Sequence, residues 1–135
     1  MAILNFTEES TSRNVPNIGG LDNVHYHDIG EGDPVIFLPS GPSTVPTTAW
    51  LNYSKTLPLL SQHFRCILVD LVNYGLTGTF EYHEPGHHVQ ARMVIALMDH
   101  LGIDKAHIVG NSVGGTTTIV LALNHPERVR SIVVG

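Results

Sequence analysis

One short stretch of the chain carries the residue types of a nucleophilic site. Ser112 lies between Gly110 and Gly114 in the pattern Gly-x-Ser-x-Gly, with an apolar run at residues 106–109 before it and a helix-forming run at residues 116–123 after it. A serine hydroxyl is a weak nucleophile unless it is held exposed beside a base and near backbone N–H donors. A sharp strand-to-helix turn exposes the serine in this way, and glycines on either side remove side chains that would clash.

The same turn predicts where a developing oxyanion would be stabilised. The N–H of Val113 points at that position, and the start of the following helix adds positive potential. The bare pattern also occurs as a small-residue turn before a helix, with no chemistry attached. The strand before it and the helix after it favour a nucleophile elbow, with Ser112 as the catalytic residue and Val113 as an oxyanion donor.

Composition restricts the classes of function. The chain has 135 residues, of which 42% are hydrophobic and 14% charged, as expected for one globular domain. The formal net charge of −5 argues against a nucleic-acid or anionic-membrane surface, because both need clustered Lys and Arg. No apolar run approaches the roughly 20 residues of a membrane span. We therefore expect no nucleic-acid or membrane partner; a small-molecule substrate is what a nucleophile at Ser112 would imply.

Cysteine use and the first residues bear on the compartment. Cys66 is the only cysteine, so no internal disulfide is possible and a reducing compartment is the simpler interpretation. Its apolar surroundings predict a buried strand residue. Residues 1–10 contain acids and no Lys or Arg, which is not the pattern of a signal peptide. We expect a cytoplasmic protein.

Two of the groups formed by the nine histidines are dense enough to suggest a metal. His25 and His27 would share one face of a half-exposed strand at residues 24–28, and His83, His87 and His88 surround a helix start. Hydrogen-bonded or solvated histidines are the more common outcome for both patterns. We expect no metal site and no cofactor.

Strand and helix patterns alternate along the chain, which predicts an α/β fold with a mostly parallel sheet and helices on both faces. Residues 6–13 could form an edge strand or a loose arm. Ser112 would lie at the carboxyl edge of the sheet, where ligands bind in such folds. Strands are expected at residues 24–28, 35–38, 65–70, 105–109 and 129–134. Helices are expected at residues 49–60, 87–101 and 113–124. Thr48 would cap the first helix and Pro58 would kink or shorten it, and Gly102 would end the second.

The order of elements and residues 104–115 resemble the α/β-hydrolase fold and, within it, the meta-cleavage product hydrolases, which hydrolyse carbon–carbon bonds in aromatic and steroid-ring catabolism. Residues 9–13, the run Trp50-Leu51-Asn52-Tyr53, and Asn111 immediately before the serine support the narrower match. The resemblance covers nearly the whole chain but only the first half of a family member. It implies that residues 1–135 are the N-terminal part of a single core domain, truncated after the strand that follows the nucleophile helix. The lid and the catalytic acid and His would lie beyond it.

Carried over by position, the resemblance gives Ser112 as the nucleophile or the residue that positions water, and Asn111 and Asn52 as polar contacts to the dienoate end of the substrate. The residues alone leave other roles open. Asn111 could bond a nearby loop from the end of its strand. Asn52 could be an exposed or capping residue of its helix.

The sequence departs from the family at two turns. Where the family has His-Gly and a glycine-rich turn, this chain has Pro39-Ser40-Gly41-Pro42. Proline has no N–H to donate, so the second oxyanion donor would be Gly41, with Ser40 the next candidate and a possible substrate contact. At the second turn, the family usually has Pro-Gly near the position that Asn73 occupies in this chain. Asparagine tolerates the left-handed conformation, so we expect that turn to survive.

Three functions remain open from the sequence. The first is a Ser-His-Asp carbon–carbon hydrolase of ring-cleavage products, with this chain inactive by itself. The second is an esterase or lactonase of the same fold, and the third is a non-catalytic fragment or binding module. The apolar strand at residues 129–134 would leave an open sheet edge, which predicts a homo-oligomer or pairing with a missing C-terminal segment.

Overall fold

A six-stranded sheet organises the chain. The computed structural model describes residues 6–41 and 47–135, and its strand order is β1-β2-β4-β3-β5-β6. The strands β3 to β6 are parallel where they pair, whereas β1 and β2 join antiparallel. This confirms the expected mostly parallel sheet. The strands are β1 (Ser12–Ile18), β2 (Leu21–Ile29), β3 (Pro34–Leu38), β4 (Arg65–Val69), β5 (Ala106–Gly110) and β6 (Val129–Val134).

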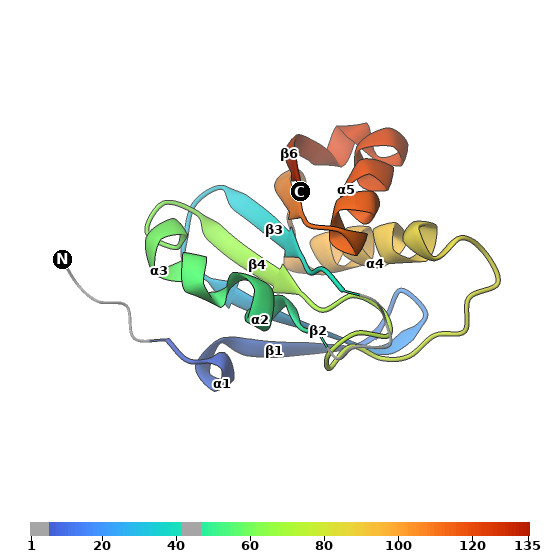
Figure 1. Cartoon of the computed structure of the whole chain (residues 1–135), viewed down its shortest axis with the longest axis horizontal. Coiled ribbons are helices and arrows are strands. Elements are labelled where there is room, and N and C mark those ends of the chain that lie inside the picture. Colours follow the sequence, from blue (N-terminus) through green and yellow to red (C-terminus); the bar gives the residue numbers. More distant parts are fainter. Residues whose placement is uncertain (1–5, 42–46) are drawn as a thin grey trace.

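Helices cover both faces of this sheet, as the sequence predicted (Figure 1). One face carries α4 (Gly86–Leu101) and α5 (Val113–Asn124). The other carries α2 (Ala49–Tyr53), the 3-10 helix η1 (Ser54–Thr56) and α3 (Leu57–Leu60). The short elements α1 (Glu8–Thr11) and η2 (Pro126–Arg128) precede β1 and β6. None of the helices in the described part of the chain is both long and apolar enough to cross a membrane.

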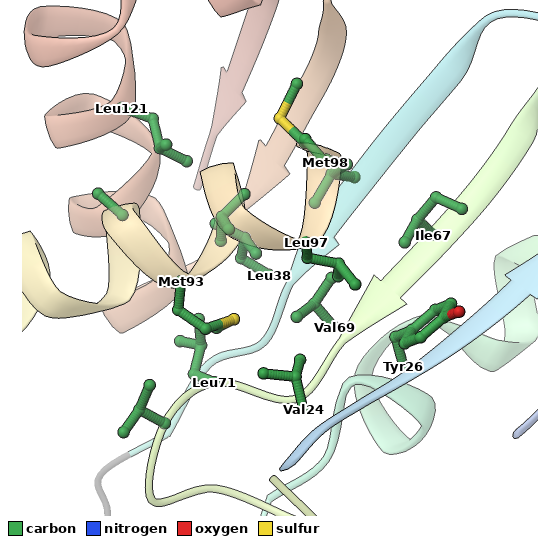
Figure 2. Close-up of a cluster of buried hydrophobic side chains, with 14 of the residues drawn as sticks. Val24, Tyr26, Leu38, Ile67, Val69, Leu71, Met93, Leu97, Met98 and Leu121 are labelled. Carbon is green, nitrogen blue, oxygen red and sulfur yellow. The ribbon is translucent and has the colours of Figure 1, made fainter. Parts of the chain in front are cut away.

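Alternate residues of the central strands pack into two separate cores. Ile36 and Leu38 of β3 join the larger cluster under α4, whereas Val35 and Phe37 join the smaller one under α2 and α3. Figure 2 shows the larger cluster, in which side chains of the sheet meet those of α4. Burial on both faces explains why these strands read as continuous apolar runs. Cys66 lies fully buried in the smaller cluster, as predicted, and burial raises the pKa of its thiol to about 11.

The helix expected over residues 49–60 is broken into three short pieces. Thr48 caps its start as predicted, because the Thr48 hydroxyl accepts the N–H of Leu51 at 3.1 Å. Regular α-helix ends at Tyr53, and Pro58 lies in the first turn of the separate helix α3. A proline lacks the N–H for an interior helical bond but fits a first turn, so it starts a new helix.

Residues 6–13 form neither a plain edge strand nor a loose arm. Thr7 and Ser10 make a reciprocal capping box around one helical turn, and β1 begins at Ser12. The edge strand is therefore β1 and runs to Ile18, five residues beyond the expected end of the arm. At the opposite edge lies β6, and its exposed side chains include Ile132 and Val133.

The two turns that required left-handed residues form as expected. Gly102 ends α4 with φ of 69°. Asn73 also has φ of 69°, and its side chain holds the turn by bonding both backbone groups of Phe80, at 2.8 Å to the N–H and 3.0 Å to the carbonyl. The asparagine thus adopts the conformation a glycine would and adds hydrogen bonds that a glycine could not.

The expectation of a half-exposed strand at residues 24–28 is wrong, because both of its histidines are buried. His25 is 4% exposed and His27 is 1% exposed. One hydrogen bond offsets part of the cost of burying His27: its Nδ1 lies 3.0 Å from the hydroxyl of Thr11, whereas its Nε2 is buried with no partner among the described residues. Burial, with a smaller contribution from neighbouring His25, lowers the pKa of His27 from its ordinary value to about 4.

This buried histidine predicts a loss of stability in acid. Between about pH 6.5 and 4 the unfolded chain binds a proton at His27 that the folded chain does not, so the free energy of unfolding falls as the pH drops. The contribution reaches about 3 kcal/mol. Denaturant unfolding at a series of pH values should give a steeper slope for the wild type than for His27→Gln. Equal slopes for the two proteins would contradict the assignment.

Candidate active site

Ser112 lies on a tight bend between β5 and α5. Strand β5 ends at Gly110, α5 begins at Val113, and Ser112 is exposed with φ of 55° and ψ of −115°. A non-glycine residue in this region stores about 1–3 kcal/mol of backbone strain. The bend holds the side chain out at the carboxyl end of an internal strand, which is the geometry expected for a nucleophile.

Two glycines allow the chain to bend this closely. A Cβ on Gly110 would overlap the carbonyl of Gly114 and the hydroxyl of Thr118. A Cβ on Gly114 would overlap the carbonyl of Leu38 and come within 2.6 Å of that of Pro39. Both positions are closed to any larger side chain, because real Cβ atoms never approach backbone oxygens so closely.

The backbone amides around the bend are not equivalent. The Ser112 N–H donates to the carbonyl of Gly135 at 2.9 Å, and the Gly114 N–H donates to those of Pro39 and Asn111, both at 3.0 Å. The Val113 N–H has no acceptor among the described residues. It is therefore an amide available to a ligand at the start of α5, and its role as an oxyanion donor stays a prediction.

The turn at residues 38–41 faces this bend through the bond between Pro39 and Gly114. The Ser40 N–H donates to the Oδ1 of Asn52 at 2.6 Å, and the Ser40 hydroxyl lies 3.1 Å from the same oxygen. Gly41 has φ of 105°, and its N–H has no acceptor in the described part of the chain. Gly41 thus remains the candidate for the second donor, while the amide of Ser40 is already used. Pro42 lies outside the described residues.

Two tyrosines that the sequence did not assign to the site also hold this turn. The hydroxyl of Tyr53 donates to the carbonyl of Leu38 at 2.7 Å, and that of Tyr74 donates to the carbonyl of Gly41 at 2.6 Å. Burial raises the pKa of both tyrosines, so both remain neutral donors at neutral pH. Tyr53 entered the sequence analysis only as part of the run Trp50-Leu51-Asn52-Tyr53, and Tyr74 carried no pattern that could have revealed its role.

The two asparagines expected to contact substrate are both exposed. Asn52 projects from α2 with its Oδ1 bound to Ser40, which leaves its amide NH2 without a partner among the described residues. Asn111 directly precedes Ser112, and its side chain makes no hydrogen bond to another described residue. The structure therefore leaves polar groups of both side chains available, and their contact with substrate stays a prediction.

No described histidine is hydrogen-bonded to the Ser112 hydroxyl. His107 of β5 bonds instead to the Ser131 hydroxyl at 2.7 Å, and His87 lies 3.1 Å from that of Thr117. Within residues 6–41 and 47–135, no group of three or more His, Cys, Asp or Glu side chains is placed to hold a metal ion. Among the described residues, the candidate site consists of a strained serine and two amides without acceptors, with no base in contact.

Comparison with known proteins identifies the fold. Residues 33–134 match the family described as the alpha/beta hydrolase fold. The chain belongs to the α/β-hydrolase fold family. Within this family its resemblance is to meta-cleavage product hydrolases.

Three relatives define the likeness. The chain is 35% identical over 95% of its length to a 2-hydroxy-6-oxononadienedioate/2-hydroxy-6-oxononatrienedioate hydrolase of Escherichia coli O139:H28, and covers 45% of that protein. It is 38% identical to a meta-cleavage product hydrolase structure from Pseudomonas fluorescens IP01, with a TM-score of 0.79 over 89% of this chain and 43% of that one. A structure of the epoxide hydrolase CorEH gives a TM-score of 0.82 at 25% identity, over 92% and 41%. This α/β-hydrolase chain thus spans about 45% of the length of the curated relatives it matches.

The strain at residue 112 predicts that the serine is kept at a cost in stability. Ser112→Gly should raise the free energy of unfolding by about 1 kcal/mol, since relief of the strain exceeds the entropic cost of a glycine. Ser112→Ala keeps the Cβ and should change it by less than about 0.5 kcal/mol. Chemical denaturation of the three proteins measures both differences. A glycine variant less stable than the alanine variant would show that the bend is unstrained.

Proposed function

We propose that the native protein carrying this chain hydrolyses a carbon–carbon bond in ring-cleavage products of aromatic or steroid catabolism. The observation that carries the proposal is the 35% identity, over 95% of this chain, to a relative named as a hydrolase of 2-hydroxy-6-oxononadienedioate. The fold alone would not carry it, because an epoxide hydrolase structure is equally similar in shape. The sequence identity and Asn111 beside the nucleophile favour the narrower activity.

The site supports this chemistry with two amides and one hydroxyl. A substrate carbonyl placed above Ser112 would accept hydrogen bonds from the N–H groups of Val113 and Gly41, neither of which has another acceptor among the described residues. Such donors act on charge that develops in the transition state, and the loss of one costs about 3 kcal/mol. The polar ends of Asn111 and Asn52, with the hydroxyl of Ser40, would contact the dienoate end of the substrate.

The proposed reaction needs a base in addition to these groups. The resemblance to the family implies that this base is a histidine supported by an acid, and that both would lie beyond residue 135. It would drive tautomerisation of the substrate to a ketone. Water activated at Ser112 and this histidine would then add to the carbonyl held by Val113 and Gly41. Cleavage of the adjacent carbon–carbon bond would leave a carboxylic acid and an enol.

Further parts of the proposal concern the whole protein. We place residues 1–135 as the N-terminal part of a single core domain, whose acid and histidine lie in a segment that pairs with β6. The exposed Ile132 and Val133 on the edge strand support such pairing, or pairing with a second copy. The lone, buried Cys66 supports a reducing compartment, for which we propose the cytoplasm.

The test compares two substrates on one protein. The native protein, with its chain length established by intact mass, should hydrolyse a ring-cleaved 2-hydroxy-6-oxo-dienoate with a higher kcat/KM than p-nitrophenyl esters. Ser112→Ala should lower kcat on the dienoate by about a thousandfold or more, because nucleophile and base act as one unit. Loss of the dienoate absorbance gives the rates.

Ser131→Ala is the matched control, since this serine bonds His107 in the neighbouring strands and not the site. Its rate should stay within about twofold of the wild type. Faster turnover of esters would favour the esterase or lactonase. No turnover of either substrate, with Ser112 unlabelled by a fluorophosphonate probe, would favour the non-catalytic module.

A further inference from the structure

A buried carboxylate at the carboxyl end of β4 has no part in the chemistry described above. Asp70 is 1% exposed, yet both of its carboxylate oxygens are bonded. Oδ1 accepts the N–H of Ala49 at 2.9 Å, and Oδ2 accepts that of Leu76 at 3.1 Å. Oδ2 also lies 2.8 Å from the Nδ1 of His25. A buried carboxylate with three partners fixes the elements that supply them.

The first partner leads to one side of the 38–41 turn. Ala49 is the first residue of α2, so Asp70 fixes where that helix starts. Three and four residues later the same short helix carries Asn52 and Tyr53, which bond the Ser40 N–H and the Leu38 carbonyl. Both residues lie within about one turn of Ala49, so the anchor at Asp70 constrains the position of both contacts.

The second partner leads to the other side of the turn. The loop after β4 folds back so that the Leu76 N–H reaches Asp70, and the Thr77 hydroxyl donates to the Asp70 carbonyl at 2.6 Å. Gly75 has φ of 51°, and a Cβ there would overlap the carboxylate. The loop therefore closes tightly around Asp70. From it Tyr74 reaches the Gly41 carbonyl at 2.6 Å.

The third partner orients the carboxylate itself. His25 bridges Asp70 and the Ser12 hydroxyl, which lies 2.6 Å from its Nε2. This is the residue order of a catalytic triad, but Ser12 has extended backbone, with φ of −62° and ψ of 132°, and lies where β1 begins. Without a strained bend or a helix start behind it, Ser12 lacks the features that expose and activate Ser112. The row of hydrogen bonds ties β1 and β2 to Asp70.

We propose that Asp70 is a positioning residue that sets the direction of the Gly41 N–H through two supports, α2 and the loop carrying Tyr74. The proposal rests on the function proposed above, since it assigns Gly41 as an oxyanion donor. The supports meet the turn at Leu38, Ser40 and Gly41, so a change at Asp70 reaches the donor without touching substrate. A misplacement of about 1 Å at such a donor costs about a hundredfold in rate.

Asp70→Asn in the native protein is the test. The amide keeps one acceptor, but its NH2 group faces the donors of Leu76 and His25, which breaks the second support. We expect kcat on the dienoate to fall by about 10- to 100-fold with KM changed by less than about threefold, because an oxyanion donor acts mainly in the transition state. Tyr74→Phe removes only the hydroxyl bonded to Gly41, and should lower kcat by about 3- to 10-fold. It decides the question if Asp70→Asn fails to fold.

Asp28→Asn is the matched control. Asp28 is a half-buried carboxylate on β2, bonded to Arg65 at 2.7 and 3.0 Å, and Arg65 lies at the opposite end of β4 from Asp70. This variant should lower Tm but leave kcat within about twofold of the wild type. If the two variants lowered Tm equally and also had the same kcat, Asp70 would have only a structural role.

Hydrogen exchange gives a readout that does not need turnover. The Ser40 amide, protected in the wild type by Asn52, should exchange at least about tenfold faster in Asp70→Asn and unchanged in Asp28→Asn. An unchanged Ser40 rate in Asp70→Asn would overturn the positioning claim. Suppose that the wild type failed to hydrolyse the dienoate but the Ser40 amide exchanged faster in Asp70→Asn. The proposed function would then fail, while the role of Asp70 in positioning the 38–41 turn would stand.

Discussion

The contact between the backbone of Gly114 and the end of β3 is the constraint on which the rest of the site depends. The Gly114 N–H donates to the Pro39 carbonyl at 3.0 Å, and no Cβ fits between Gly114 and the two carbonyls of residues 38 and 39. This contact places the start of α5 against the 38–41 turn. It therefore brings the amides of Val113 and Gly41, which are far apart in the chain, to the same edge of the sheet.

The strain at Ser112 is held by the packing around this contact. One positive-φ serine costs about 1–3 kcal/mol, which the flanking elements must offset. On one side β5 is paired to both β3 and β6, and on the other α5 buries Thr117, Thr118 and Leu121. The packing of these buried elements thus offsets the backbone strain that holds the Ser112 hydroxyl exposed.

The sequence predicted those features whose causes are local. The Gly-x-Ser-x-Gly spacing predicted the bend, the apolar runs predicted β3 to β6, and Thr48 and Gly102 marked helix ends. It failed where distant residues decide. His25 and His27 look half-exposed until Thr11, Ser12 and Asp70 are brought to them, and the bonds from Tyr53 and Tyr74 to the 38–41 turn have no signature in sequence. The sequence ranked Gly41 ahead of Ser40 as a donor, but that Asn52 occupies the Ser40 amide could be seen only in the structure.

The most direct test of this account is a crystal structure of the native protein with an aryl phosphonate covalently attached to Ser112, whose P–O oxygen stands in for the oxyanion. The account predicts that this oxygen lies about 3 Å from both the Val113 and the Gly41 nitrogens, as in a working oxyanion hole. An oxygen bound to neither amide, or a phosphonate attached to another residue, would contradict it.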